Sequence, residues 1–254
     1  MKGFRALLVA ALLVAGGSAR AGVVELALLI DGSGSLGQNN WDLQIGAYQA
    51  IFGSGTFYDD FVVGGDVLRV DAWRFDLNVT NIVDADNDGA FVDDDGWFTI
   101  ANNADAVAFA NALDTTYVGG WTNMGGAIEV AINNFDANGQ QGARRVVDIS
   151  TDGVPCLPSQ LGGCPANVAQ YAVDLASRGI QTNVIGVGNG FDDIHVQPLT
   201  GATGGFIAFA DDFGVFESAL EAKLFREINQ VPAPAGVAFL GLLLLGLRRS
   251  LVRR

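Results

Sequence analysis

Apolar positions follow two alternating patterns along the chain, and the patterns predict strands and helices in turn. Short apolar runs bounded by turn residues predict buried strands at residues 23–30, 67–75, 144–150, 180–187 and 206–210. Apolar positions spaced three and four apart predict helices at residues 41–52, 104–113, 124–135, 165–179 and 212–228. This alternation favours an α/β domain with a Rossmann-like, mainly parallel sheet and helices on both faces.

The first 21 residues have the parts of a secretory signal peptide. Lys2 and Arg5 form a positive start, residues 6–15 are apolar, and Ala19-Arg20-Ala21 has the form of a cleavage site. The mature chain is expected to begin at Gly22, with the folded domain at residues 22–230; a buried N-terminal helix is the alternative. Export places the domain where disulfides persist.

Residues 231–254 form a second targeting segment. A Val231-Pro232-Ala233-Pro234 stretch precedes an uncharged apolar run at 235–247, and four arginines follow. The layout resembles the PEP-CTERM sorting signal of Gram-negative bacteria, although Ala233 stands where that family usually has Glu. The resemblance implies transient membrane contact, cleavage near residue 231 by an exosortase-type enzyme, and a place in the cell envelope, surface or extracellular matrix. A plain tail anchor is the alternative, although the run is shorter than the roughly 20 residues of a full span.

The charge of the chain is unevenly divided. The leader and the tail hold three and four of the 14 basic residues, which leaves seven against all 28 acidic ones, a net charge of −21 for residues 22–230. A surface this acidic repels phosphate backbones, so nucleic acid is not expected as a partner, whereas cations are attracted.

Two cysteines and one histidine limit the chemistry that the chain can perform. Cys156 and Cys164 have seven residues between them and are expected to form one disulfide, with two free thiols as the alternative. His195 is the only histidine, so Ser-His-Asp catalysis would depend on it alone. It lies in a polar stretch that favours a surface turn or a short helix.

Oxygen-bearing side chains follow two predicted strands and precede one predicted helix. Asp31, Ser33 and Ser35 come directly after the first strand, Thr122 precedes the helix at 124–135, and Asp152 follows the strand at 144–150. In open α/β sheets, ligands bind at the carboxyl ends of the strands. Carboxylates and hydroxyls suit a hard ion such as Mg²⁺.

These three pieces in this order resemble the metal-ion-dependent adhesion site (MIDAS) of von Willebrand factor type A domains. The pieces are D-x-S-x-S from Asp31, G-x-T-x-x-G-x-A-I from Gly120, and Asp152-Gly153; the stretch 143–153 resembles a bacterial secreted branch. The resemblance covers residues 23 to about 228. It implies that Ser33, Ser35 and Thr122 bind Mg²⁺ or Mn²⁺ through their hydroxyls. Asp31 and Asp152 would act through water, and a carboxylate of a partner would complete the shell.

An acidic segment between predicted strands has the spacing of a calcium-binding loop. Asp84, Asp86, Asp88 and Asp95 fall at positions 1, 3, 5 and 12, and Gly89 falls at position 6. The preceding residues 79–83 look like a strand, so flanking helices are not evident. Ca²⁺ binding and a solvated acidic hairpin loop are both open here.

Three functions fit the sequence. The favoured one is a non-enzymatic binding or adhesion module, exported or displayed on the surface, that grips an acidic group of a protein or polysaccharide through the cation. A structural envelope or matrix protein stabilised by metal is the second, and a metal-dependent hydrolase is the third. The hydrolase is disfavoured because the motif offers no spare general base. Trp121 either shapes the partner surface or caps the core.

Overall fold

A computed structural model describes residues 22–62, 66–84, 97–140 and 143–229. These residues form a seven-stranded sheet in the order β3-β2-β1-β5-β6-β7, with β4 paired to β2. Strands β2, β1, β5, β6 and β7 are parallel, and β3 and β4 are antiparallel to β2. The strands are β1 (Val23–Asp31), β2 (Val67–Phe75), β3 (Val79–Asn81), β4 (Phe98–Ile100), β5 (Arg144–Thr151), β6 (Ile180–Val187) and β7 (Ile207–Ala210). The predicted α/β fold class is confirmed.

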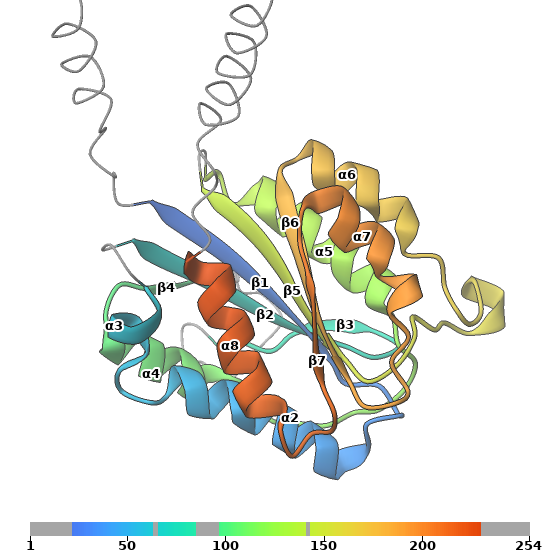
Figure 1. Ribbon diagram of the computed structural model, residues 1–254, viewed down its shortest axis with the longest axis horizontal. Coiled ribbons are helices and arrows are strands. Elements are labelled where there is room, and N and C mark those ends of the chain that lie inside the picture. The colour runs from blue at the N-terminus through green and yellow to red at the C-terminus, as the bar shows by residue number, and fades with distance from the viewer. Residues whose placement is uncertain (1–21, 63–65, 85–96, 141–142, 230–254) are drawn as a thin grey trace, which may run out of the picture.

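Helices cover both faces of the sheet (Figure 1). One face carries α2 (Gly37–Phe52), α3 (Phe57–Phe61), α4 (Asn103–Ala112) and α8 (Phe216–Asn229). The other face carries α5 (Met124–Ala137), α6 (Ala172–Ser177) and α7 (Gln197–Thr203). Short 3-10 turns are η1 (Ser159–Leu161), η2 (Ala169–Tyr171) and η3 (Asp193–His195). Within the described ranges no helix is long and apolar enough to cross a membrane.

The central strands are apolar throughout because each face of the sheet has its own core. In β1, Ala27 and Leu29 pack under α5, whereas Leu26, Leu28 and Ile30 pack under α2 and α8. All five side chains are fully buried. Burial on both faces explains why β1, β2, β5 and β6 agree within one residue with their predicted ranges.

Three predicted helix starts are wrong, each for a local reason. Helix α2 begins at Gly37 rather than 41 because its first turn is polar and solvent-facing, which no apolar pattern reveals. Helix α8 begins at Phe216 rather than 212 because the Asp212 side chain accepts a hydrogen bond from the Gly214 N–H and forms a turn. The helix expected from 165 is η2 followed by α6, since the Ala166 N–H donates to the Pro155 carbonyl. Helices α3 and α7 and strand β4 were not predicted.

A buried charged group lies between α8 and β5. Lys223 Nζ is 2.5 Å from Asp148 Oδ1 and 2.7 Å from Glu227 Oε1, and all three side chains are fully buried. We call these residues the Lys223 triad. Burial raises the pKa of Glu227 well above its usual range, and the nearby Asp148 carboxylate raises it further. The triad therefore holds one lysine against one carboxylate and one carboxyl group that tends to keep its proton.

Candidate metal centre

Parallel strands bring two acidic loops to the same edge of the sheet. β1 and β5 are neighbours, and Ile30 pairs with Ser150. This register sets Asp31 beside Thr151, so the loop after β1 faces the loop after β5. The predicted ligands of the two loops therefore meet, although they are more than 100 residues apart in the sequence.

Four of the five predicted ligands form one hydrogen-bonded chain. Asp31 Oδ1 accepts a hydrogen bond from the Ser33 N–H at 2.8 Å. The hydroxyl oxygens of Ser33 and Ser35 are 3.0 Å apart, and Ser35 Oγ donates to Asp152 Oδ1 at 2.7 Å. Asp31 and Ser33 are buried, while Ser35 is exposed, so the chain runs from the interior to the surface.

Thr122 reaches this group through its backbone. The Gly34 N–H donates to the Gly120 carbonyl at 2.9 Å, and the Cys156 N–H donates to the Thr122 carbonyl at 2.9 Å. The Thr122 loop therefore lies between the other two loops. In the described chain, no hydrogen bond links the Thr122 hydroxyl to the other four side chains. Gly120 has φ +129°, and a Cβ there would lie 3.2 Å from Leu77 N, so this turn requires glycine.

Three side chains hold the Asp31–Ser35 loop in place, and the sequence analysis did not predict them. Thr151 donates its hydroxyl hydrogen to Asp31 Oδ2. Gln44 Nε2 donates to the Asp31 carbonyl at 2.7 Å, and the Tyr117 hydroxyl donates to the Ser33 carbonyl at 3.1 Å. Thr151 carries a usable signal, because it immediately precedes Asp152 at a strand end. The other two contacts depend on packing that no local pattern encodes.

Arg74 is the basic residue nearest the first loop, and its charge is already engaged. Its stem passes beneath Gly32, where a Cβ would lie 2.6 Å from Arg74 Cγ. The guanidinium is 3.3 Å from Asp76 and 3.5 Å from Asp114, and it donates to the Thr116 carbonyl at 2.7 Å. The absence of a side chain at Gly32 thus allows Arg74 to pass under the loop and contact Asp76, Asp114 and Thr116.

The electrostatics of the site leave negative charge without a partner. Burial raises the pKa of Asp31 to about 7, and the nearby Asp152 carboxylate adds to this effect. Burial also raises the pKa of Asp152. In the described residues, neither carboxylate forms an ion pair with a lysine or arginine. Buried carboxylates in this state favour either a proton or a cation.

The donor set fits a hard divalent cation. The residues offer two carboxylates and three hydroxyls, which are the oxygen donors that Mg²⁺ and Mn²⁺ take. Nowhere in the described ranges do three or more His, Cys, Asp or Glu side chains gather as a metal site. The candidate centre therefore depends on its hydroxyls as much as on its acids.

The expected disulfide lies beside the centre. Cys156 and Cys164 are bonded, with their Cα atoms 4.4 Å apart. The Cys156 N–H hydrogen bond to the Thr122 carbonyl ties the bridged loop to the Thr122 loop. The disulfide prediction is confirmed, and the bridge braces one side of the candidate centre.

The remaining predicted residues lie elsewhere or outside the described ranges. His195 lies in η3, as its polar surroundings indicated, and its Nε2 is 3.9 Å from Asp192 Oδ2. Asp84 follows the bridge between Val83 and Leu113, and its N–H donates to the Ala112 carbonyl. Asp86, Asp88 and Asp95 fall outside the described residues, as do residues 1–21 and 231–254. The calcium loop and both targeting segments remain predictions.

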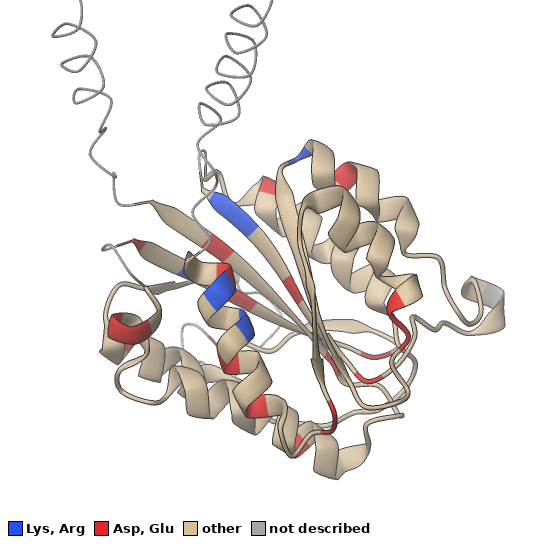
Figure 2. Ribbon diagram, in the orientation of Figure 1, with Lys and Arg blue, Asp and Glu red and all other residues tan. Residues whose placement is uncertain are grey.

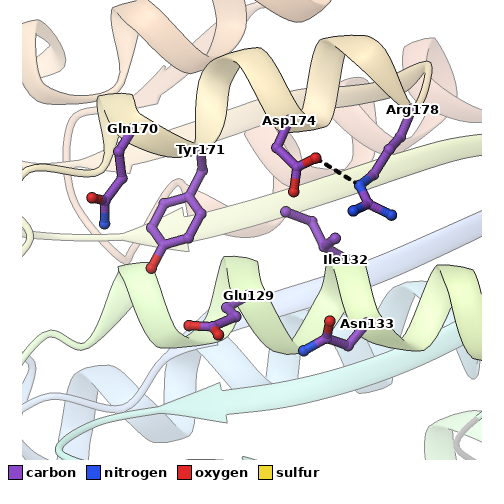
Figure 3. A pocket seen from close by; sticks show the side chains of 7 residues that line it. All are labelled: Glu129, Ile132, Asn133, Gln170, Tyr171, Asp174 and Arg178. Carbon is purple, nitrogen blue, oxygen red and sulfur yellow. Dashed lines mark hydrogen bonds and ion pairs between the residues drawn. The ribbon is translucent and has the colours of Figure 1, made fainter.

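An open groove of about 440 Å³ lies between α5 and the η2–α6 segment (Figure 3). Arg178 Nε is 2.8 Å from Asp174 Oδ1, and Arg178 also pairs with Asp136. The charge of Arg178 is therefore engaged by Asp174 inside the groove and by Asp136 beside it. None of the predicted metal ligands lines it; its lining residues are Glu129, Ile132, Asn133, Gln170, Tyr171, Asp174 and Arg178.

Comparisons with known proteins give a family match and a fold. The family model described as "Protein of unknown function (DUF1194)" matches residues 22–232. A search of curated proteins finds no match.

Several solved structures have the same fold. A von Willebrand factor type A protein from Catenulispora acidiphila has 16% identity and a TM-score of 0.57, covering 82% of this chain and 43% of its own. Proximal thread matrix protein 1 from the mussel byssus, with a zinc-occupied MIDAS motif, has 15% identity and a TM-score of 0.56, covering 80% and 47%. The pilus adhesin SpaC from Lactobacillus rhamnosus GG, in its open conformation, has 16% identity and a TM-score of 0.56, covering 82% and 30%.

These likenesses show that the fold is that of von Willebrand type A domains. The chain spans less than half the length of each of the three proteins.

Proposed function

The chain belongs to the DUF1194 family and has the von Willebrand type A fold, and on this premise we propose that it is an exported binding module. It grips an acidic group of a partner through a divalent cation at the edge of the sheet. The observation that carries the proposal is the pair of carboxylates, Asp31 and Asp152, which lie close together without a basic partner. Their pKa values are raised by burial.

Each residue of the site has a distinct proposed role. The hydroxyls of Ser33, Ser35 and Thr122 are the direct ligands of Mg²⁺ or Mn²⁺, and Asp31 and Asp152 act through water. The hydrogen bonds from Thr151 and the Ser33 N–H hold the Asp31 carboxylate in place. A bound cation supplies positive charge and a coordination position for a carboxylate of the partner. With both acids committed to the ion, the site has no spare general base, which supports a non-enzymatic role.

Two solved structures with this fold support the proposal of a metal-dependent binding module. The mussel thread protein has a MIDAS motif occupied by zinc, and SpaC is a pilus adhesin. For this chain we propose the same kind of site, with residues 1–21 as its export signal. Residues 231–254 are proposed to be the sorting tail that an exosortase-type enzyme removes at the envelope of a Gram-negative bacterium.

Calorimetric titration of the full chain with MgCl₂ and MnCl₂ tests the site. Wild type is expected to bind one ion per chain at the candidate centre. Asp31→Ala loses this binding, whereas Asp42→Ala, which removes an exposed aspartate from α2, keeps it. Equal binding by wild type and Asp31→Ala would overturn the assignment of the centre.

Capture experiments separate the proposed role from its alternatives. The full chain, immobilised in Mg²⁺ and then in EDTA, is offered the surface fraction of the source organism. If the chain is an adhesion module, it should retain a partner from this fraction in Mg²⁺, and both EDTA and Asp31→Ala should abolish this retention. A rise in melting temperature with Mg²⁺ but no metal-dependent retention would favour a structural matrix protein. Metal-dependent turnover of a generic ester would favour a hydrolase.

A further inference from the structure

Three large apolar side chains are exposed beside the candidate metal centre. Leu77 is 44% exposed, Val118 is 54% exposed and Trp121 is 43% exposed. We call these residues the apolar flank. Leu77 follows β2, whereas Val118 and Trp121 belong to the loop that leads to Thr122. Trp121 therefore does not cap the core, and its ring is available at the surface.

Contacts around Leu77 and Gly120 join the apolar flank to the loops of the candidate metal centre. Leu77 N and Cβ lie 3.2 and 3.6 Å from the position that a Cβ on Gly120 would take, and Asn123 Nδ2 donates to the Leu77 carbonyl. The Gly120 carbonyl in turn accepts from the Gly34 N–H, inside the Asp31–Ser35 loop. The flank and the proposed ligands thus share one connected surface.

The flank is not occupied by the rest of the described chain. Within the described ranges, Trp121 makes no contact with another aromatic ring, and its indole N–H has no hydrogen-bond acceptor. An amphipathic ring with a free N–H is the kind of side chain that anchors protein interfaces. Exposed apolar side chains next to a functional site indicate an interaction surface.

Basic side chains are absent from the surface at this end of the molecule. All seven basic residues of 22–230 are described. Arg74 is at this end, but its side chain is only 7% exposed and is paired with Asp76 and Asp114. Acidic residues cluster where β1 and β5 end, whereas basic ones lie toward the other end and on α8 (Figure 2). Positive charge for a partner at this end of the molecule would therefore come from the proposed ion.

From this charge distribution and the apolar flank, we infer that the partner is a protein segment with one acidic side chain beside a large apolar side chain. The inference rests on the proposed function and narrows it. A polyuronate carries a carboxylate on every sugar, so the acids around the centre would repel all but the one that meets the ion. A single carboxylate with an apolar neighbour matches one ion beside Leu77, Val118 and Trp121.

Selection of displayed peptides tests the inference. The full chain is panned in Mg²⁺ against a random 12-residue peptide library on phage, and bound phage are eluted with EDTA. The enriched peptides are expected to share an Asp or Glu within two positions of Leu, Ile, Phe or Trp. Synthetic copies are then titrated against wild type and against the double variant Leu77→Ser/Trp121→Ser. The matched control is Val173→Ser, which removes an aliphatic side chain that is 78% exposed on α6.

The double variant is expected to bind the peptides about tenfold more weakly or worse, because exposed aromatic anchors carry much of the binding energy of an interface. Val173→Ser should bind as wild type does. Peptides that need their Asp or Glu but bind the double variant as tightly as wild type would overturn only the role of the apolar flank. An empty selection, or metal-dependent binding of oligogalacturonate instead, would overturn the protein partner. Peptide binding that is indifferent to EDTA and to Asp31→Ala would overturn the proposed function itself.

Discussion

Two groups of acids, one beside β5 and one at its end, differ in how their charge is neutralised. In the Lys223 triad, Asp148 and Glu227 share a lysine that the fold provides, and all three side chains are sealed between α8 and the sheet. At the end of the same strand, Asp152 and the neighbouring Asp31 form no ion pair in the described chain. The first group is complete within the polypeptide, whereas the second fits a cation taken from solution. Burial of acidic side chains alone therefore does not indicate a cation site; the missing opposite charge is what distinguishes the Asp31 group from the Lys223 triad.

Removing the positive charge of Lys223 is expected to have the largest effect on stability. Lys223→Met leaves two acids buried without a positive charge, and such losses cost about 3–5 kcal/mol of stability. Urea unfolding followed by circular dichroism in EDTA measures the loss. The triple variant Lys223→Met/Asp148→Asn/Glu227→Gln removes the charges together and should regain most of it. A Lys223→Met variant as stable as wild type would contradict the role given to the lysine.

Neutralising Asp31 at the candidate metal centre is expected to have the opposite effect and to stabilise the metal-free fold. The pKa of Asp31 is raised to about 7 in the folded chain, so the metal-free fold binds this proton more tightly than the unfolded chain. The associated stability is fully present below about pH 4 and is lost as the pH rises through about 7. Asp31→Asn in EDTA should therefore be more stable than wild type at pH 8, by on the order of 1–3 kcal/mol.

Urea midpoints at pH 5 and pH 8, with and without Mg²⁺, measure this effect. The advantage of Asp31→Asn should shrink at pH 5, and Mg²⁺ should stabilise wild type alone. Asp42→Asn serves as the control for loss of an exposed aspartate. A metal-free Asp31→Asn variant that is less stable than wild type at pH 8 would show that the carboxylate is already compensated.

The smallest expected effect comes from Glu227→Gln. The raised pKa of Glu227 means that the folded chain holds this proton more tightly than the unfolded chain does. Its contribution to stability is present at low pH and is lost as the pH rises through the raised pKa. Glutamine does not ionise, so the variant should differ from wild type by less than about 1 kcal/mol at pH 4, where Glu227 is protonated in both states, and should gain on it as the pH rises above this value. A pH series of urea midpoints, with exposed Glu221→Gln as control, measures the divergence; parallel curves would contradict it.

The sequence predicted the central sheet well because its strands are buried on both faces and are therefore apolar without interruption. It predicted helix starts less well, because the first turn of α2 is polar and Asp212 forms a turn before α8. A local pattern shows which residues are apolar, but it does not show which side-chain hydrogen bonds compete with the helix.

The candidate site was predicted in part, and the missing part has one cause. Asp31, Ser33, Ser35 and Asp152 lie at or just after strand ends, and the resemblance to the MIDAS motif grouped them as ligands. Gln44 and Tyr117 at the site, and the Lys223 triad elsewhere in the molecule, depend on packing between distant parts of the chain. Lys223 and Glu227 are four apart on α8, a spacing typical of an exposed ion pair. Only the packing of α8 on β5 shows that they are buried.

Both ends of the described domain leave from the edge of the sheet that is opposite the metal loops (Figure 1). Val24 of β1 pairs with Arg144, whose guanidinium donates to the Ile228 carbonyl near the end of α8. A domain tethered at either end would therefore present Asp31 away from its attachment, and tension from the proposed partner would run lengthwise through it. Tension toward Val23 follows the backbone of β1, and its parallel ladders are loaded in shear. Tension toward Asn229 would pass through α8, which the Lys223 triad and the Arg144 hydrogen bond to Ile228 link to β5.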